Sequence, residues 1–297
     1  MAKRLSAACR NAAGDDYEII LVNDGSTDST WVKMSALAGK DSRITAVNLS
    51  RNYGHQLALS AGLSLSRGDR VFVLDADLQD PPELLNDMIE LMDREGADVV
   101  YGQRTGRKGE SWGKCFSASL FYKLLGRLGE VPIPHEAGDF RLMSRRAVDI
   151  LNSMPERSRY IRGMVSWIGL KQVPLPYERQ PRFAGRTNYP LRKMLRLAVD
   201  AVTGFSTIPL RIASYAGAFM GIAAIVVLLY ALYVWLAGET VQGWTSLMVV
   251  VLALGSVQLV SLGVFGEYLG RLYMEAKQRP LFIIDKIERS ERSAPEA

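Results

Sequence analysis

The sequence predicts an α/β domain over residues 1–186, followed by an amphipathic helix and two transmembrane helices. Three observations support this prediction. Short apolar runs alternate with helical segments, as in a mostly parallel, Rossmann-like sheet with right-handed crossovers. Acids and amides directly follow several of these runs. After residue 186 the composition changes to a basic segment and then to two long stretches without charge.

Each element of the α/β domain is predicted from a local pattern. Short runs of β-branched and apolar residues between polar residues indicate strands, here over Tyr17–Val22, Ile44–Leu49, Arg70–Leu74 and Asp98–Tyr101. Helical segments are expected between them, over Ser29–Leu37, Gln56–Leu65 and the amphipathic Leu84–Arg94. Two prolines before the last of these stop a strand and start a helix. We expect the charged tail, residues 287–297, to be frayed.

Two apolar stretches predict membrane spans. No charged residue lies between Arg211 and Glu239, or between Glu239 and Glu267. Each gap exceeds the roughly 18 apolar residues that indicate a spanning helix. We expect spans over residues 212–237 and 246–265, with an interfacial aromatic belt of Tyr230, Tyr233, Trp235 and Trp244. A helical hairpin buried in a soluble core is the alternative.

Basic residues flank this pair of spans. Arg192, Lys193, Arg196 and Arg211 precede it, and Arg271, Lys277 and Arg279 follow it. The connection between the spans carries only Glu239, so the positive-inside rule places both ends of the chain, including a tail over 271–297, in the cytoplasm. Apolar residues at helical spacing over 187–210 indicate a basic amphipathic helix at the lipid interface; an ordinary surface helix is the alternative.

An acidic pair follows the apolar run 71–74. Asp75 and Asp77 are two residues apart, so on an extended segment they point the same way, and Gln79 repeats the spacing. Neighbouring carboxylates repel each other unless a cation or proton separates them. Mg²⁺ or Mn²⁺ is the natural cation, because it prefers oxygen ligands and also takes substrate phosphates. An acidic turn that caps a helix is the alternative.

Composition narrows the classes of function. The 297-residue chain has a net charge of +5, which fits nucleic acid, a membrane surface or phosphorylated substrates. Membrane flanks and phosphate sites account for the basic residues, so we expect no nucleic-acid partner. Two cysteines and two histidines give no disulfide framework and argue against a histidine-based zinc site or catalytic triad.

These motifs together resemble a known family. Residues 23–28, 75–83 and 138–142, with the two apolar stretches, resemble the polyprenyl-phosphate glycosyltransferases, which are inverting GT-A enzymes. The match is nearest to the bactoprenol glucosyltransferase group, with dolichol-phosphate mannose synthase as a cousin. The resemblance covers about Asp16 to Ile287. It implies a sugar nucleotide donor, a divalent metal ion, a polyprenyl phosphate acceptor in the membrane, and a homo-oligomer, in relatives a tetramer.

The resemblance also implies site residues. Asp24 would contact the nucleoside of the donor, and Asp75, Asp77 and Gln79 would hold the metal on its diphosphate. Asp139 matches the acid proposed as catalytic base. The acceptor phosphate has a second pKa of about 6 and is mostly deprotonated at neutral pH, so a base is not obligatory. We therefore expect Asp139 to orient the site or assist the metal, with the base role left open.

Basic residues are expected where the phosphates meet. Arg104 and Lys114 follow the strand ending at Tyr101 and are assigned to the acceptor phosphate, with a solvated loop as the alternative. Arg141 would pair with a phosphate or with Asp139. Arg186 lies in a segment that resembles the family's mobile donor loop and would substitute for a lysine missing there. The two histidines, His55 and His135, are expected to be structural.

The sequence departs from the family at its beginning. Relatives open with an apolar strand that supplies the first central strand and part of the nucleotide pocket, whereas Met1–Leu5 resembles the interior of the first helix. Losing a central strand would leave backbone groups of its neighbours unpaired.

The expected function is transfer of a hexose, with glucose from UDP-glucose as the first choice, to undecaprenyl phosphate. The reaction would proceed with inversion on the cytoplasmic face of the inner membrane and would serve O-antigen or other envelope glycans. One alternative is the same chemistry with GDP-mannose or an aminosugar donor. Another is a catalytically inactive membrane subunit, because the first strand is absent.

Overall fold

The computed structural model describes residues 1–77, 79–105, 137–178, 207–237 and 243–290. These form two units. The first is an α/β unit that contains the described residues up to 178 together with 279–290. The second contains 207–237 and 243–278, which are two long helices.

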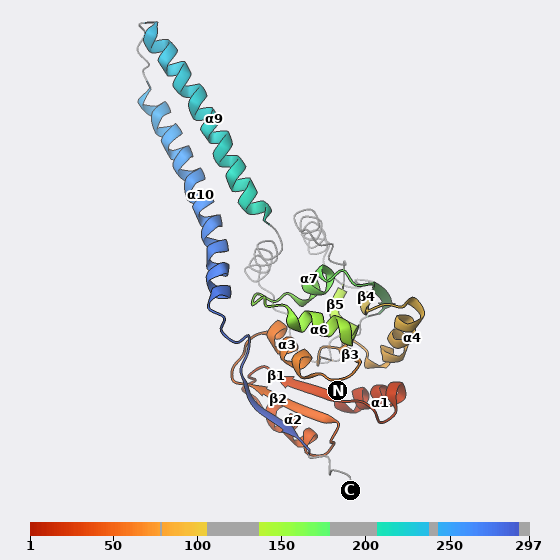
Figure 1. Ribbon diagram of the computed structural model, residues 1–297. Coiled ribbons are helices and arrows are strands. Elements are labelled where there is room, and N and C mark those ends of the chain that lie inside the picture. The colour runs from red at the N-terminus through yellow and green to blue at the C-terminus, as the bar shows by residue number, and fades with distance from the viewer. Residues whose placement is uncertain (78, 106–136, 179–206, 238–242, 291–297) are drawn as a thin grey trace. The chain divides into compact units, whose positions relative to one another are not determined.

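The α/β unit alternates strands and helices as predicted (Figure 1). Its strands are β1 (Ile19–Asn23), β2 (Ile44–Leu49), β3 (Arg70–Val73), β4 (Val99–Arg104), β5 (Ala137–Ser144), β6 (Gln172–Tyr177) and β7 (Ile284–Arg289). Its helices are α1 (Ala2–Ala13), α2 (Thr30–Ala38), α3 (His55–Leu65), the 3₁₀ turn η1 (Pro82–Leu84), α4 (Leu85–Glu95), α6 (Arg145–Ser153) and α7 (Ile161–Trp167). The elements predicted between residues 17 and 101 are all confirmed, with ends shifted by a few residues.

The strands form two mixed sheets, in the orders β1-β2-β7 and β3-β5-β4-β6. Among the strands that the structure describes, only the pairs β1–β2 and β4–β6 are parallel. β7 runs antiparallel to β2, and β5 runs antiparallel to both β3 and β4. The α/β class is therefore confirmed. The sheets are mixed rather than mostly parallel, because β5 and β7 run antiparallel to the strands beside them.

The two sheets meet at β1 and β3. Within the described residues, β1 pairs only with β2 and β3 pairs only with β5. Among the residues that the structure describes, one edge of each of these two strands therefore has no partner strand. The starts of the strands are joined by Glu18, which accepts hydrogen bonds from the backbone N–H of Arg67 at 2.7 Å and from its guanidinium at 3.0 Å.

One hydrophobic cluster nevertheless joins the two sheets. Ala46 comes from the first sheet and Phe140 from the second, and both are buried. Helices α1 and α4 complete the cluster with Leu5 and Met88, and Met88 is fully buried. Apolar burial of this kind contributes about 25 cal/mol per Å² removed from water. The core therefore holds the two sheets in one unit, although no strand pair among the described residues joins them.

The chain returns to the α/β unit after its second long helix. β7 pairs with β2 in the register Val47↔Ile287 and Leu49↔Ile284, and Ile284 packs on the cluster formed by Val47, Leu49 and Ala61. The prediction of a frayed tail is thus wrong for residues 287–289, because their backbone groups complete a sheet. Residues 291–297 lie outside the described residues.

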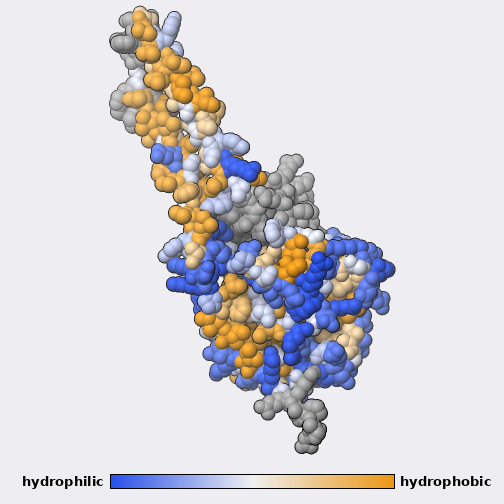
Figure 2. All heavy atoms as spheres, in the orientation of Figure 1, coloured by the Kyte–Doolittle hydropathy of each residue, from blue (hydrophilic) through white to orange (hydrophobic). Residues whose placement is uncertain are grey.

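The second unit contains α9 (Ile208–Leu236) and α10 (Trp244–Ala276). Within Ile208–Val234 and Val249–Ala276, windows of 18 residues reach mean hydropathies of 2.3 and 2.2 and are not buried against protein. Their surface is mostly hydrophobic, in contrast to the mixed surface of the α/β unit (Figure 2). Both helices are therefore long and apolar enough to cross a membrane. The amphipathic segment predicted over 187–210 lies mostly outside the described residues.

The packing of β7 yields a stability prediction. Ile284→Ala removes a half-buried side chain from the β2–β7 cluster, and we expect it to lower the free energy of unfolding by about 1–2 kcal/mol. Lys286→Ala changes an exposed position of the same strand and should stay within about 0.5 kcal/mol of the wild type. Unfolding of the purified full chain, followed by tryptophan fluorescence, measures both. Equal effects of the two substitutions would contradict the role of β7 in the core.

Candidate active site

Acidic residues lie at one edge of the sheets, after the carboxyl ends of β1 and β3 and near the amino end of β5. Asp24 follows β1 and Asp75 lies two residues after the end of β3. In the antiparallel β3–β5 pair, Val73 is opposite Arg141. Continuing this register places Asp75 opposite Asp139, so two carboxylates that are 64 positions apart in the sequence become neighbours.

Asp139 is buried and surrounded by donors. Arg162 of α7 donates two hydrogen bonds to it, from Nε to Oδ1 at 2.9 Å and from Nη2 to Oδ2 at 3.1 Å. His55 and Gln56 of α3 also contact Oδ2, at 2.9 and 3.3 Å. Burial opposes ionisation, but the hydrogen bonds from His55 and Arg162 outweigh it and hold the pKa of Asp139 well below its usual range. A carboxylate so engaged is a weak proton acceptor.

His55 lies between the two opposing carboxylates. Its Nε2 is 2.9 Å from Asp139 Oδ2 and 3.6 Å from Asp75 Oδ1, and its side chain is 53% exposed. The hydrogen bond to Asp139, against desolvation and helped by the charge of Asp75, raises the pKa of His55. The ring of His55 therefore contacts two residues of the acidic edge, and its expected structural role stays a prediction.

The predicted metal-binding residues lie on one short segment. Asp75 follows β3, Asp77 Oδ1 accepts a hydrogen bond from the backbone N–H of Gln79 at 3.1 Å, and Gln79 is buried. Burial raises the pKa of Asp75, and the negative charges of neighbouring carboxylates raise it further.

A cation would relieve this repulsion. Within the described residues no three His, Cys, Asp or Glu side chains are gathered into a ready-made metal cage. Two carboxylates and an amide nonetheless fit Mg²⁺ or Mn²⁺, because such ions are commonly bound by one or two carboxylates and complete their shell with substrate phosphates.

Asp24 fixes the loop that leads into α3. Its two oxygens accept hydrogen bonds from the backbone N–H groups of Tyr53 and Gly54, at 2.7 and 2.9 Å. Gly25 has a φ of +64°, and a Cβ there would lie 2.5 Å from the backbone of Arg51 and Asn52. Glycine is therefore required for the two loops to approach, and Asp24 holds the segment that presents His55.

The predicted phosphate-binding residues are distributed differently. Arg104 ends β4 and is half-buried at the same edge, with Nε 3.4 Å from the hydroxyl of Tyr177. Arg141 has a side chain that is only 3% exposed, and its Nη2 donates to the carbonyl of Gly138 at 3.0 Å. Contact between Arg141 and an acceptor phosphate is not supported, because the guanidinium is enclosed by protein. Lys114 and Arg186 lie outside the described residues.

Sequence reasoning missed three residues of this cluster, namely His55, Gln56 and Arg162. They come from α3 and α7, far from the acidic motifs in sequence. The sequence pattern could have indicated His55 and Gln56, because they begin a helix that follows a strand. The starts of such helices lie at the ligand-binding edge of an α/β sheet. Nothing in the sequence pointed to Arg162.

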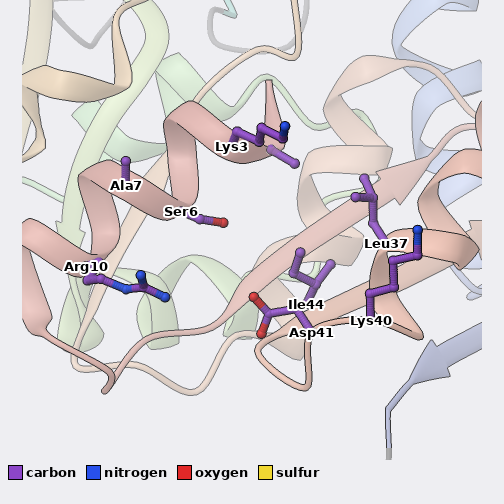
Figure 3. A pocket seen from close by; sticks show the side chains of 9 residues that line it. Lys3, Ser6, Ala7, Arg10, Leu37, Lys40, Asp41 and Ile44 are labelled. Carbon is purple, nitrogen blue, oxygen red and sulfur yellow. The ribbon is translucent and has the colours of Figure 1, made fainter.

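A separate pocket of about 320 Å³ lies between α1 and the α2–β2 connection. Figure 3 shows Lys3, Arg10 and Lys40 around it. Its lining includes Ile44, the first residue of β2, so it lies at the opposite end of the strands from Asp24 and Asp75. This pocket does not belong to the acidic edge.

An α/β unit with an acidic segment after β3 and a second acid opposite it is the arrangement of a glycosyltransferase that uses sugar nucleotides, and comparisons with known proteins agree. Residues 1–151, which contain Asp24, Asp75 and Asp139, match Glycosyl transferase family 2. The chain belongs to glycosyl transferase family 2, and the resemblance to polyprenyl-phosphate glycosyltransferases is confirmed.

Several relatives match nearly the whole chain. The uncharacterized glycosyltransferase YkcC of Bacillus subtilis (strain 168) is 45% identical over 92% of this chain and 84% of its own. The bactoprenol glucosyl transferase of Shigella phage SfII is 40% identical over 92% of this chain and 89% of its own. The prophage bactoprenol glucosyl transferase homolog of Escherichia coli (strain K12) is 39% identical over 92% and 90%.

The donors around Asp139 yield a second prediction. Asp139→Asn leaves the buried Arg141 and the half-buried Arg162 without their anion, and we expect a loss of about 3 kcal/mol in the free energy of unfolding. Asp93→Asn is the matched control, because Asp93 also accepts two hydrogen bonds from one arginine, Arg70, but its side chain is 56% exposed. It should cost less than about 1 kcal/mol. Denaturant unfolding of the full chain compares them, and similar losses would show that Asp139 does not hold the site together.

Proposed function

We propose that this chain transfers glucose from UDP-glucose to undecaprenyl phosphate, with inversion, at the cytoplasmic face of the inner membrane. The observation that carries the proposal is the extended likeness to the bactoprenol glucosyl transferase of phage SfII, 40% over 278 residues. That alignment covers 92% of this chain, so it includes most of the acidic edge and the two apolar helices. The product would supply O-antigen or other envelope glycan modification.

The proposed reaction needs no proton transfer from the acceptor. A phosphate monoester has a second pKa of about 6, so its oxygen is mostly deprotonated at neutral pH. This oxygen attacks the anomeric carbon, the new carbon–oxygen bond forms, and the bond to the β-phosphate of the donor breaks. UDP leaves with the bonding electrons from the opposite face, which gives inversion. The weak basicity of Asp139 agrees with this scheme.

Asp139 then acts through its neighbours. Its hydrogen bonds fix the guanidinium of Arg162 and the imidazole of His55 at the edge where donor and acceptor would meet. Held in place before the substrates arrive, these groups cost no reorganisation at the moment of reaction. We assign Asp139 the role of a positioning anion rather than a base.

The acidic segment is the proposed place of the metal. Asp75, Asp77 and Gln79 would hold Mg²⁺ or Mn²⁺, which offsets charge on the leaving diphosphate. Asp24 would contact the nucleoside with lone pairs left after its two backbone hydrogen bonds. Arg186 would contact the donor as well.

Arg104 and Lys114 are proposed to bind the acceptor phosphate, because Arg and Lys suit phosphate recognition. The two apolar helices would anchor the enzyme beside its lipid acceptor. Basic residues on both flanks support a cytoplasmic α/β unit, where sugar nucleotides are available. The amphipathic segment over 187–210 would lie at the lipid interface.

Two other functions are alternatives to this one. Another sugar nucleotide, such as GDP-mannose or an aminosugar donor, would use the same edge, since the roles proposed for Asp24, Asp75 and Asp77 concern the nucleoside and the diphosphate rather than the sugar. A catalytically inactive membrane subunit that binds nucleotide or lipid is the other alternative. Retention of Asp75, Asp77 and Asp139 on one edge favours the enzyme.

A transfer assay tests the proposed function. Membranes that contain the full chain, supplied with radiolabelled UDP-glucose, undecaprenyl phosphate and Mn²⁺, should place label in the lipid phase, and EDTA should abolish it. Asp77→Asn should lower the rate about 100-fold or more, as expected when one charge-stabilising group is lost. Asp87→Asn, an exposed acid of α4, is the matched control and should keep the wild-type rate.

The outcomes separate the three functions. Label from GDP-mannose but not from UDP-glucose would replace the donor and keep the chemistry. An intact, membrane-inserted chain that transfers no sugar from any of these donors would support the inactive subunit. Full activity of Asp77→Asn would remove the metal-binding assignment.

Cysteine labelling tests the orientation. In a background of Cys9→Ala and Cys115→Ala, we expect Gln242→Cys in the α9–α10 connection to react with a membrane-impermeant maleimide in intact cells. Lys40→Cys, an exposed position at the end of α2, should react only after permeabilisation. The reverse pattern would overturn the proposed topology, because it would place the α/β unit outside the cytoplasm.

A further inference from the structure

Tyr177 joins three parts of the acidic edge. It is the last residue of β6 and is 5% exposed. Its hydroxyl is 2.5 Å from Oδ1 of Asp80, the residue that ends the acidic segment, and Asp80 is 1% exposed. The same hydroxyl is 3.4 Å from Nε of Arg104, at the end of β4. A single oxygen therefore links the acidic segment to the proposed phosphate-binding arginine.

The direction of these hydrogen bonds follows from their chemistry. A guanidinium can only donate, so Arg104 donates to the tyrosine oxygen. The hydroxyl proton of Tyr177 is then directed to the Asp80 carboxylate. Burial and the hydrogen bond to Asp80 raise the pKa of Tyr177 to about 12, so the hydroxyl keeps its proton at neutral pH. Arginine, tyrosine and aspartate form an ordered donor–acceptor chain.

Packing holds the Tyr177 ring in the orientation that this chain requires. The Phe140 ring contacts it at a centroid distance of 5.2 Å and an angle of 53°. Gly102 leaves the space that the ring occupies, because a Cβ there would lie 2.7 Å from Tyr177 Cε1. Beside the ring, Thr105 donates from its backbone N–H to the Tyr177 carbonyl at 2.9 Å. The hydroxyl is thus fixed by strand pairing and by ring contacts together.

We infer that Tyr177 is a positioning residue of the donor site, which sets Asp80 and Arg104 relative to each other through its hydroxyl. Gln79 and Asp80 are buried, whereas Asp75 and Asp77 are partly exposed toward the edge. The buried end of the segment therefore determines where the exposed carboxylates lie. The part of this inference that concerns the donor rests on the proposed function.

The Tyr177→Phe substitution removes the hydroxyl and keeps the ring. Asp80 then loses a hydrogen bond in a buried place, which favours movement of the segment. We expect hydrogen–deuterium exchange of peptides covering 75–84 to become at least about fivefold faster. We expect the KM for the metal–UDP-glucose complex to rise about tenfold, corresponding to about 1.4 kcal/mol, with kcat changed less than about threefold.

Tyr17→Phe is the matched control. The Tyr17 hydroxyl is also buried, but it has no hydrogen-bond partner among the described residues, so its loss should leave exchange at 75–84 and the KM unchanged. Unchanged exchange at 75–84 in Tyr177→Phe would overturn the inference. So would faster exchange spread evenly over the α/β unit, since that is the signature of a core hydroxyl without a positioning role.

The exchange experiment uses no substrate, so it separates this inference from the proposed function. The exchange rates at 75–84 can be compared whether or not the protein transfers sugar. A wild type that transfers no glucose, together with faster exchange confined to 75–84 in Tyr177→Phe, would reject the proposed donor and keep the positioning role. A wild type that transfers glucose, together with unchanged exchange at 75–84 in Tyr177→Phe, would keep the proposed donor and reject the positioning role of Tyr177.

Discussion

The arrangement of this protein depends on a buried carboxylate, Asp139, that faces the acidic segment after β3. Two carboxylates at neighbouring positions of paired strands repel each other in a medium of low polarity. In this protein the repulsion is reduced because side chains of α3 and α7, namely His55, Gln56 and Arg162, form hydrogen bonds with Asp139. Asp75 is left to face the open edge, where a divalent ion can neutralise it. One acid organises the protein and the other is available to a ligand.

This division of roles explains why elements distant in sequence converge on one edge. α3 is fixed by Asp24 through the loop at its start, and α7 is fixed by Arg162. β6 contributes Tyr177, and the ring of Phe140 beside it belongs to the same strand as Asp139. The edge is therefore a set of hydrogen bonds between elements rather than the property of a single motif.

Local patterns in the sequence were enough to predict the strands and helices between residues 17 and 101. They also placed Asp75 and Asp77 at the carboxyl end of a strand, where α/β sheets bind ligands, whereas Asp139 was assigned from the family resemblance alone. They could not reveal that β5 runs antiparallel to β3, which is what brings Asp139 opposite Asp75. The burial of Arg141 and the contact of Arg162 with Asp139 depend on tertiary packing, and so does β7, in which four of the six residues are charged.

The position of β7 has a consequence for biosynthesis. The strand that completes the first sheet is made only after both apolar helices, roughly a hundred residues after β6. At about 5–20 residues per second, translation needs about 5–20 s to reach it. During that interval the edge of β2 is unpaired and exposed to aggregation. Synthesis of the two apolar helices thus precedes closure of the first sheet, which only the last described strand completes.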